Sequence, residues 1–291
     1  MKRPTFSILD VFAEQKYAGN QLAVFRSAGE LSDAEMQHIA REINFSETTF
    51  ILSDEERAGG FDVRIFTPKE EVPFAGHPTI GTAQVIHDQI LHGKEDKIVL
   101  NLKVGQIPVK FSPDGFCWMT QKQPEFGQQH PADLLAGVLG LDPAEIETRF
   151  PVQEVSTGLP FFIVPLKTLA ALQKARVDKP KYEALIQDTV AKGILIFCPE
   201  AHQPQNDISV RVFVDYYGVP EDPATGSGNG CLAGYLVEYR CFGQASIDLR
   251  AEQGYEIGRP SLLLLRAAQT GDAIQVEVGG KSILVAQGEF V

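Results

Sequence analysis

A short pattern recurs in this chain at a fixed distance, and the repetition constrains the fold more than any other feature. Val63-Arg64-Ile65-Phe66 returns as Val210-Arg211-Val212-Phe213, a displacement of 210 − 63 = 147 residues. Val72-Pro73 returns as Val219-Pro220, and 219 − 72 is again 147. In both places a turn of small residues and an apolar helical segment follow. Two matches at one offset predict two copies of one lobe, and chance similarity of two β–turn–α units is the alternative.

The length of the chain agrees with two lobes, because 291 residues is about twice a typical domain of roughly 100–150 residues. We expect an N-terminal lobe over residues 1–122, which residues 281–291 can complete, and a C-terminal lobe over residues 123–280. Gln, Pro and Gly cluster in 121–130, which predicts a linker. Ser32-Asp33-Ala34-Glu35 is a capping box that predicts the start of a helix. Two further helices are expected over Thr79–Leu91 and Asn229–Tyr239.

Composition excludes some classes of protein. Hydrophobic residues make up 44% of the chain and charged residues 22%, as in an ordinary globular protein. The net charge of −12 argues against a nucleic-acid partner, whose phosphates need a basic face. Asp10 interrupts the first apolar run too early for a signal peptide, and no run approaches the ~20 apolar residues of a membrane span. The four cysteines lack CxxC spacing, so buried reduced thiols are expected rather than disulfides or metal ligands. These features predict a cytoplasmic enzyme without a membrane partner.

If the lobes are copies, a pseudo-twofold axis relates them and their turns can face each other across a cleft. Each turn leads into a helix whose first N–H groups lack partners within the helix. Two such helix N-termini favour an anionic group by roughly 0.3–1 kcal/mol each, or ~2 when partly buried. The arrangement suits a small carboxylate, or the negative charge that develops when a C–H proton is removed.

Glu47 is the first candidate for chemistry. It stands in Asn44-Phe45-Ser46-Glu47-Thr48-Thr49-Phe50, between a predicted helix and an apolar strand. Partial desolvation at such a joint raises the pKa of a carboxyl group, which suits it to accept and return a proton. The alternative is a glutamate that caps a local N–H or pairs with a basic side chain.

His77 is the second candidate. It stands between Gly76 and Pro78 at the start of a predicted helix, where a neutral imidazole could donate to a substrate oxygen. The alternative is a histidine that bonds to nearby backbone in a tight turn. His87 and His92 are five residues apart and do not share a helix face, so no metal site is expected.

The second turn, Glu221-Asp222-Pro223-Ala224-Thr225-Gly226-Ser227-Gly228, combines carboxylates, hydroxyls and glycines that allow close backbone approach. It is not a phosphate-binding loop, because no Gly-Lys-Ser/Thr follows. It is not a dinucleotide fingerprint either, because the glycine spacing is wrong. The alternative is a turn that only opens a helix.

Along essentially its whole length the chain resembles the PhzF-like proteins, a family named after the isomerase of phenazine biosynthesis. The matching stretches are Asp10-Val11-Phe12, Gly19-Asn20-Gln21-Leu22-Ala23-Val24, Asn44–Phe50, Arg64-Ile65-Phe66-Thr67-Pro68, Phe74-Ala75-Gly76-His77-Pro78, Glu221–Ser227 and Gly258-Arg259-Pro260-Ser261. The resemblance implies an α+β fold like that of diaminopimelate epimerase, with two pseudo-symmetric lobes, each a mixed sheet wrapped around a central helix. It also implies a homodimer and no cofactor.

The resemblance carries site residues as well. The acid/base glutamate of the family falls on Glu47. The substrate-binding residues fall on Ser46, Gly76, His77, Asp222, Gly226 and Ser227. Diaminopimelate epimerase and proline racemase place a cysteine in each turn, but here the first turn has none and Cys231 lies inside the second helix. Two-thiol racemisation is therefore disfavoured.

The expected function is a cofactor-independent isomerase that moves a proton on a small cyclic carboxylic acid in the cleft between the lobes, with Glu47 as the single acid/base. One alternative is a Glu47-based epimerase of an amino or hydroxy acid. The other is a protein that binds a small metabolite without catalysis.

Overall fold

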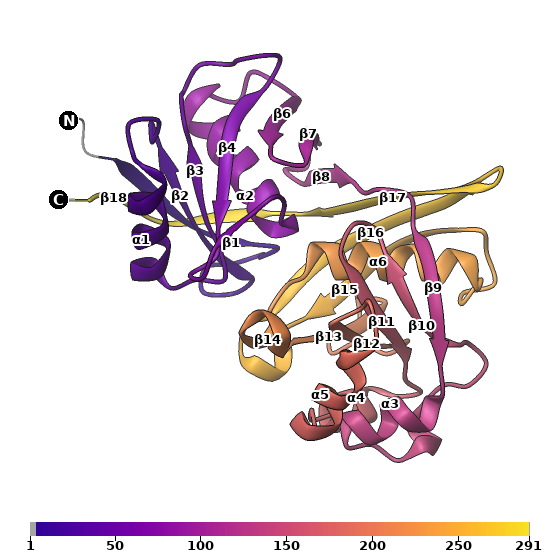
Figure 1. Cartoon of the computed structure of the whole chain (residues 1–291). Helices are drawn as coiled ribbons and strands as arrows, with labels where there is room; N and C mark the ends of the chain where they lie inside the picture. Colours follow the sequence, from indigo (N-terminus) through magenta and orange to yellow (C-terminus); the bar gives the residue numbers. More distant parts are fainter. Residues whose placement is uncertain (1–3, 291) are drawn as a thin grey trace. The chain divides into compact units, whose positions relative to one another are not determined.

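The structure is a computed structural model that describes residues 4–290 (Figure 1). Residues 1–3 and Val291, which the predicted lobe boundaries include, lie outside the described residues. The chain forms two compact units. Unit 1 comprises Met1–Thr120 and Gly279–Val291, and unit 2 comprises Gln121–Val278. In the described part of the chain, no helix combines the length and apolar character needed to cross a membrane.

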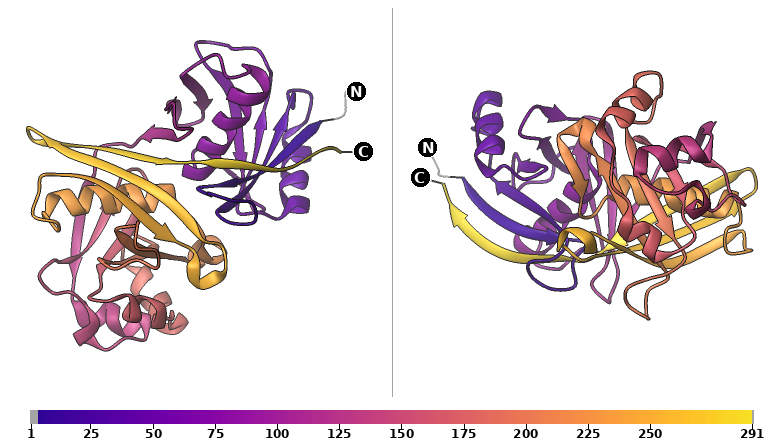
Figure 2. Two further views of the ribbon diagram at one scale, coloured as in Figure 1. Left: turned by 180° about the vertical axis from the view of Figure 1, so that it is seen from behind. Right: turned by 90° about the horizontal axis from the view of Figure 1, so that it is seen from below.

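Unit 1 is built on a mixed sheet with the strand order β18-β1-β2-β3-β4-β6-β7-β8. The pairs β2–β3 and β4–β6 are parallel, the other neighbours are antiparallel, and the short β5 pairs with β4. The last strand of the chain, β18, lies beside the first, as the yellow and indigo strands of Figure 2 show. The strands are β1 (Thr5–Val11), β2 (Asn20–Arg26), β3 (Thr48–Ile51), β4 (Phe61–Phe66), β5 (Glu71–Val72), β6 (Lys97–Leu102), β7 (Gly105–Phe111), β8 (Cys117–Thr120) and β18 (Ser282–Glu289).

Helices cover both faces of this sheet. The helix α2 (Gly76–Val85) is almost wholly buried against β1, β2, β3, β6, β7 and β8, and a π-helical turn, η1 (Ile86–Ile90), follows it. A Cβ on Gly81 of α2 would come within 2.6 Å of the Leu22 side chain, so glycine permits the close approach. The helix α1 (Asp33–Ile43) shares a core with Phe25. Leu22 and Phe25 are three residues apart on β2, so their side chains face opposite sides of the sheet. The helices α2 and α1 therefore lie on opposite faces. We call the almost wholly buried α2 the inner helix of unit 1.

Unit 2 has a second mixed sheet with the order β9-β10-β11-β12-β13-β15-β16. Its parallel pairs are β11–β12 and β13–β15, and the short β14 pairs with β13. The strands are β9 (Glu125–His130), β10 (Val152–Ser156), β11 (Pro160–Pro165), β12 (Gly193–Cys198), β13 (Ile208–Val214), β14 (Val219–Asp222), β15 (Ser246–Gln253), β16 (Ser261–Thr270) and β17 (Ala273–Gly280).

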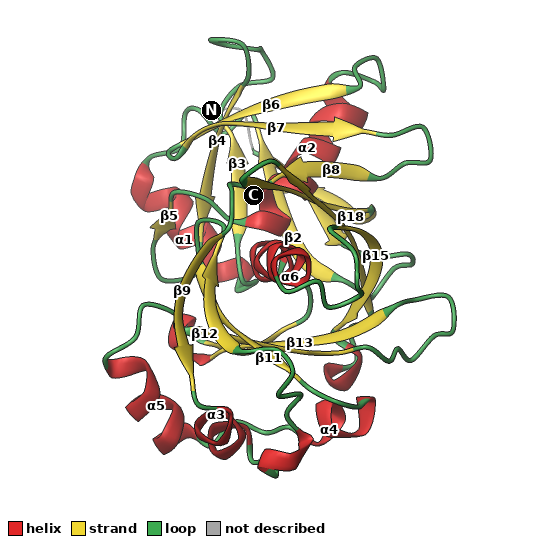
Figure 3. Ribbon diagram, turned by 90° about the vertical axis from the view of Figure 1, so that its right-hand side faces the viewer, coloured by secondary structure: helices red, strands yellow, loops and turns green. Residues whose placement is uncertain are grey.

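One long helix of unit 2, α6 (Gly226–Glu238), is buried against β10, β11, β15 and β16, and Figure 3 shows it end-on among the strands. Three helices share a separate core with the other face of the sheet: α3 (Ala132–Leu139), α4 (Leu169–Lys174) and α5 (Lys179–Gln187). Three short 3-10 turns complete the unit: η2 (Pro143–Glu145), η3 (Asp215–Tyr217) and η4 (Tyr255–Ile257). Like unit 1, unit 2 is therefore a mixed sheet around an inner helix.

The repeated sequence pattern falls on equivalent strands, β4 and β13, and each is followed by the short strand and the inner helix. The echoed arginines make equivalent contacts. Arg64 bonds to Glu71 of β5 at 2.7–2.8 Å, and Arg211 bonds to Glu221 of β14 at 2.8–2.9 Å. Each guanidinium also lies over the phenylalanine two residues along its strand. The prediction of two pseudo-symmetric α+β lobes is confirmed.

Some local predictions are confirmed and others are wrong. The capping box at Ser32 is present and opens α1. The segment interpreted as a linker contains the strand β9, which pairs with β10. Two helices begin earlier than predicted. The helix α2 begins at Gly76 because proline is tolerated within the first helical turn, and α6 begins at Gly226.

Candidate functional site

Glu47 lies between α1 and β3 in unit 1, at the predicted joint between a helix and a strand. Asn44 takes the left-handed conformation (φ 56°) that ends α1, and the chain then enters β3 at the buried Thr48. The Glu47 side chain is 20% exposed. Its position at a joint between helix and strand therefore shields the carboxyl group from much of the solvent while leaving it accessible.

His77 lies in the first turn of α2, and its side chain is 6% exposed. Asn20 Nδ2 lies 3.3 Å from His77 Nδ1. Burial lowers the pKa of His77 from 6.5 to about 3, and a hydrogen bond with the Gln21 backbone only partly offsets this effect. The imidazole is therefore neutral at physiological pH.

Glu47 and His77 lie next to each other. His77 Nε2 is 3.5 Å from Glu47 Oε2, and this nitrogen is buried without a hydrogen-bond partner. The distance is beyond a good hydrogen bond, so the pair is a polar contact and not a strong ion pair. Ser46 is half-buried beside Glu47, and Gly76 is the buried first residue of α2. The structure thus places all four residues predicted in this part of the chain either on the joint that precedes β3 or in the first turn of α2.

The second predicted turn lies in unit 2, between β14 and α6. Asp222 is the last residue of β14, and the Thr225 hydroxyl donates to Asp222 Oδ2 at 2.5 Å. Gly226 is buried at the start of α6, and Ser227 follows half-buried. The helix has no side-chain cap and no acidic residue in its first turn. Its N-terminal N–H groups and positive dipole end therefore suit an anionic ligand group.

Sequence reasoning assigned no role to the residues that hold this second turn. Gln253, the last residue of β15, bonds to the backbone carbonyl of Asp222 and to Thr225. Asn229 of α6 bonds to Gln253 and to the Thr225 carbonyl. Gln253 is 28 residues from Thr225 along the chain. No local pattern marks such a contact.

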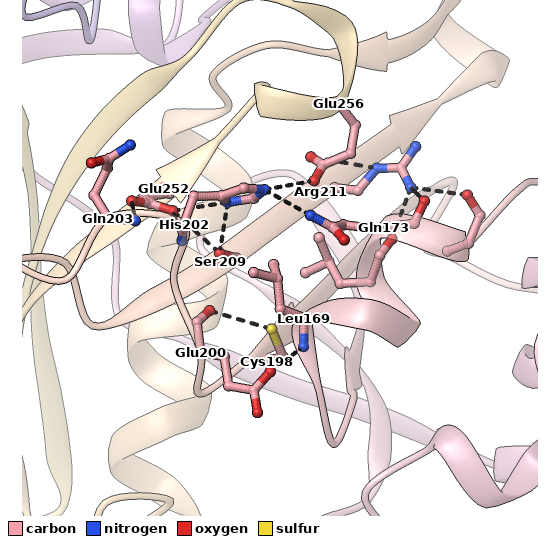
Figure 4. A network of polar contacts seen from close by, with 12 residues as sticks. Leu169, Gln173, Cys198, Glu200, His202, Gln203, Ser209, Arg211, Glu252 and Glu256 are labelled. Carbon is pink, nitrogen blue, oxygen red and sulfur yellow. Dashed lines mark hydrogen bonds and ion pairs between the residues drawn. The ribbon is translucent and has the colours of Figure 1, made fainter.

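Unit 2 also contains a polar network that the prediction did not include (Figure 4). Glu252 accepts hydrogen bonds from the backbone of His202 and Gln203, and its carboxylate lies 3.0 Å from His202 Nδ1. His202 Nε2 lies 3.1 Å from Glu256 Oε1, and Glu256 Oε2 lies 4.0 Å from Arg211 Nε. The network joins the β12–β13 loop to β15 and η4, which indicates a structural role. Among residues 4–290, no group of three His, Cys, Asp or Glu side chains is arranged to hold a metal ion.

These two sets of residues define a class of protein. Unit 1 offers a carboxyl group beside a neutral imidazole, which suits proton transfer. Unit 2 offers a carboxylate, hydroxyls and an uncapped helix N-terminus, which suit the binding of a small polar acid. The fold with its repeated inner helices and these side chains is compatible with an enzyme that acts on small molecules.

The family follows from comparison with known proteins. The family model of the phenazine biosynthesis-like (PhzC-PhzF) proteins matches residues 9–288. The chain belongs to this PhzF family, and its enzyme class is isomerase. It is 35% identical to trans-2,3-dihydro-3-hydroxyanthranilate isomerase of Pseudomonas aeruginosa, over 97% of this chain and 98% of that protein. It is 30% identical to an uncharacterized isomerase of Clostridium acetobutylicum, over 97% of this chain and 96% of that protein.

Solved structures agree with this family. A PhzF-family phenazine biosynthesis protein of Bacillus anthracis matches all of both chains with a TM-score of 0.91 and 26% identity. A predicted epimerase from Pseudomonas aeruginosa matches 100% of this chain and 99% of that chain, with a TM-score of 0.81 and 33% identity. A hydroxyproline epimerase from Agrobacterium vitis shares the fold alone, with a TM-score of 0.62 and 10% identity over 100% of this chain and 91% of that one. The prediction of a diaminopimelate epimerase-like fold is confirmed.

Proposed function

We propose that this isomerase shifts a proton, and with it a double bond, on a small cyclic carboxylic acid without a cofactor, and that Glu47 is its single acid/base. The observation that carries the proposal is the contact between Glu47 Oε2 and His77 Nε2 at 3.5 Å. A half-buried carboxyl group beside a neutral, buried imidazole can exchange a proton without forming a competing ion pair. The relative in Pseudomonas aeruginosa, named as an isomerase of trans-2,3-dihydro-3-hydroxyanthranilate, supports a cyclic acid as the substrate class.

In the proposed reaction, ionised Glu47 removes a proton from a carbon next to a π-system of the substrate. The electron pair of the broken C–H bond moves into that system, the double bond shifts, and the Glu47 carboxylic acid returns its proton to a different carbon. His77 and Asp222 bind and orient the polar groups of the substrate. Ser46, Gly76, Gly226 and Ser227 contribute hydroxyl and backbone contacts. General acid–base catalysis of this kind supplies typically ~10²–10⁴-fold in rate.

The test is the variant Glu47→Gln, assayed for turnover of trans-2,3-dihydro-3-hydroxyanthranilate. The change removes the titrating group with little change in volume, so we expect kcat to fall at least about 10²-fold, the lower end of the range for a lost acid/base. Glu42→Gln is the matched control, because Glu42 is exposed on α1. It should leave kcat unchanged. Full turnover by Glu47→Gln would remove Glu47 from the mechanism.

A reaction in deuterated buffer tests whether one group both removes and returns the proton. If Glu47 alone carries it and is sheltered from water, the new C–H bond should contain less deuterium than the solvent. Complete deuterium incorporation would indicate exchange with water during the catalytic cycle or another base.

Epimerisation is a second candidate, because one structure at 33% identity is described as a predicted epimerase. On this chain it would depend on Glu47 and not on thiols. Cys231 is buried inside α6, and burial raises its pKa to about 11, so the thiol is protonated at neutral pH. A chiral assay separates the candidates, since epimerisation inverts a stereocentre and leaves every double bond in place.

We also propose a homodimer in the cytoplasm that takes a small carboxylate as its substrate. Family resemblance supports the dimer. Light scattering coupled to size-exclusion chromatography tests it, because a monomer would elute with a mass near 31.9 kDa.

A further inference from the structure

The buried amide of Gln253 is the centre of the hydrogen bonds that hold the second turn. Gln253 Nε2 donates to the Asp222 carbonyl at 2.7 Å and to Thr225 Oγ1 at 3.0 Å. Its Oε1 accepts from the Thr225 backbone N–H at 3.1 Å and from Asn229 Nδ2 at 2.8 Å. The residue is 1% exposed. An amide side chain has two donors and two acceptor lone pairs, so these contacts use its full capacity.

The direction of each hydrogen bond follows from the partners. The backbone N–H of Thr225 can only donate, so the Gln253 atom that faces it must be the oxygen. The nitrogen then faces Thr225 Oγ1 and donates to it. The Thr225 hydroxyl has one hydrogen, which is therefore directed to its other neighbour, Asp222 Oδ2, at 2.5 Å. Gln253 thus makes the hydroxyl a donor to the Asp222 carboxylate.

The backbone fixes Gln253 in this place. The next residue, Gly254, has a φ of 78°, and a Cβ there would lie 2.4 Å from the Arg259 carbonyl oxygen and 2.7 Å from that of Pro223. Only glycine allows this approach between the end of β15 and the second turn. On the other side of Gln253, Glu252 anchors the strand through the network in Figure 4. The amide is therefore held against the turn from both sides.

We propose that Gln253 is a positioning residue for the isomerase reaction, which orients the Thr225 hydroxyl and through it the Asp222 carboxylate that binds the substrate. This inference rests on the role of Asp222 in the proposed function. Gln253 itself need not contact the substrate, and its effect on the reaction passes through Thr225.

The test compares Gln253→Met with the unchanged protein. Methionine has a similar volume but cannot form the four bonds, so the hydroxyl loses its fixed direction. Loss of a hydrogen bond to a charged group weakens binding by roughly 10–100-fold. We expect the KM for trans-2,3-dihydro-3-hydroxyanthranilate to rise about 10–100-fold while kcat changes less than about threefold. The reason is that the lost interaction binds the substrate equally well in the ground state and in the transition state. The Kd of 3-hydroxyanthranilate, an aromatic analogue, should rise in the same proportion.

A merely structural role gives a different result. Partial unfolding lowers the concentration of active enzyme, so kcat falls while KM stays constant, and that outcome would overturn the proposal. The control is Glu154→Gln. Glu154 is buried in β10, where it bonds to His130 and to the Ala191 N–H, so its loss weakens unit 2 without touching the second turn. This variant should leave KM unchanged.

A double-mutant cycle tests the route through Thr225. Thr225→Val removes the hydroxyl, and we expect the combination with Gln253→Met to raise KM no more than the larger single change does. If the effects of Thr225→Val and Gln253→Met on KM are additive instead, the route through Thr225 is contradicted. Thr225→Ser keeps the hydroxyl and should keep KM within about twofold of the unchanged protein.

The outcome of these experiments does not depend on the role of Glu47. If Glu47→Gln stays active while Gln253→Met raises KM, the acid/base assignment fails and the positioning role stands. If Glu47→Gln is inactive and Gln253→Met leaves KM unchanged, only the positioning role fails.

Discussion

At the scale of single residues, the environment of His77 decides which form of the imidazole lies beside Glu47. The side chain is buried, its nearest carboxylate oxygen is 3.5 Å away, and burial outweighs the contacts that favour the cation. A charged imidazole would hold Glu47 in an ion pair and make it a weaker base. The neutral form leaves Glu47 available for the proton transfer that we propose.

Burial of neutral His77 predicts a loss of stability at acid pH. Its pKa is about 3 in the folded protein and rises to the ordinary histidine value of 6.5 in the unfolded chain, so the unfolded chain binds the proton first as pH falls. The stabilisation is fully present above pH 6.5 and is lost as pH falls toward 3, with a slope of up to ~1.4 kcal/mol per pH unit. Urea titrations from pH 7 to 4.5 should show this slope, and His77→Gln should lack it.

Nuclear magnetic resonance checks the same prediction directly. The imidazole nitrogen shifts of His77 should remain those of a neutral ring from pH 8 to pH 5. A midpoint near 6.5 would contradict the buried neutral state. An equal slope of stability against pH in the unchanged protein and in His77→Gln would assign the acid sensitivity to other groups.

The residue scale also marks the limit of sequence reasoning. Glu47, His77 and Asp222 could be named because each stands in a short motif that resembles those of the PhzF-like proteins. Gln253 could not be assigned a role, because it ends a strand of ordinary composition and meets Thr225 only after β15 is placed beside β13. Contacts between distant segments have no local signal in a single sequence.

At the scale of elements, the two arginines of the repeated pattern fasten the short strands that lead to the inner helices. Their environments differ. The Arg211 side chain is 3% exposed and that of Glu221 is 10%, whereas Arg64 is 20% exposed. Arg211 Nη1 also donates to the carbonyls of Leu172 and Ala175 at the end of α4. Loss of Arg211 would therefore leave more buried polar atoms without a partner than loss of Arg64 would.

Replacing each arginine by methionine should reveal this difference. Arg211→Met leaves the buried Glu221 carboxylate and two carbonyls without their donor, so the free energy of unfolding should fall by about 3–5 kcal/mol. Arg64→Met breaks a more exposed pair whose Glu71 retains Lys103 at 2.5 Å, and should cost about 1 kcal/mol. Equilibrium unfolding in urea measures both. Equal losses would show that burial does not set the contribution of the pair.

Elements also differed in how well the sequence predicted them. The capping box and the strands β4 and β13 were predicted because a hydrogen-bonding motif and a repeat marked them. The strand β9 was missed because most of its residues are exposed, so no apolar alternation distinguishes it from a linker. The segment is extended because it pairs with β10, and its own sequence does not indicate this pairing.

At the scale of the whole molecule, the two units acquire their equivalent edge strands in different ways. In unit 2, β9 precedes β10 along the chain and pairs with it. In unit 1, the strand beside β1 is β18, which comes from the other end of the chain. Phe290, just after β18, packs on Phe6 and Phe25 with ring centroids 5.4 and 4.9 Å apart. Unit 1 is therefore incomplete without the last residues, although its other strands are contiguous in sequence.

This arrangement predicts that a circular permutant will fold. Thr5 is paired with Glu289, and the Phe290 N–H bonds to the Pro4 carbonyl at 3.2 Å, so a linker of about five Gly and Ser residues can join the ends. New ends between Thr120 and Gln121 make both units contiguous, with unit 2 first. We expect its circular dichroism spectrum to match that of the unchanged protein and its urea midpoint to stay within about 1 M. Deletion of residues 282–291 should instead abolish the cooperative unfolding of unit 1, because β1 loses one of its two neighbouring strands and Phe6 and Phe25 lose the Phe290 ring. A truncated chain as stable as the permutant would mean that β18 is dispensable and that unit 1 is complete before Gln121.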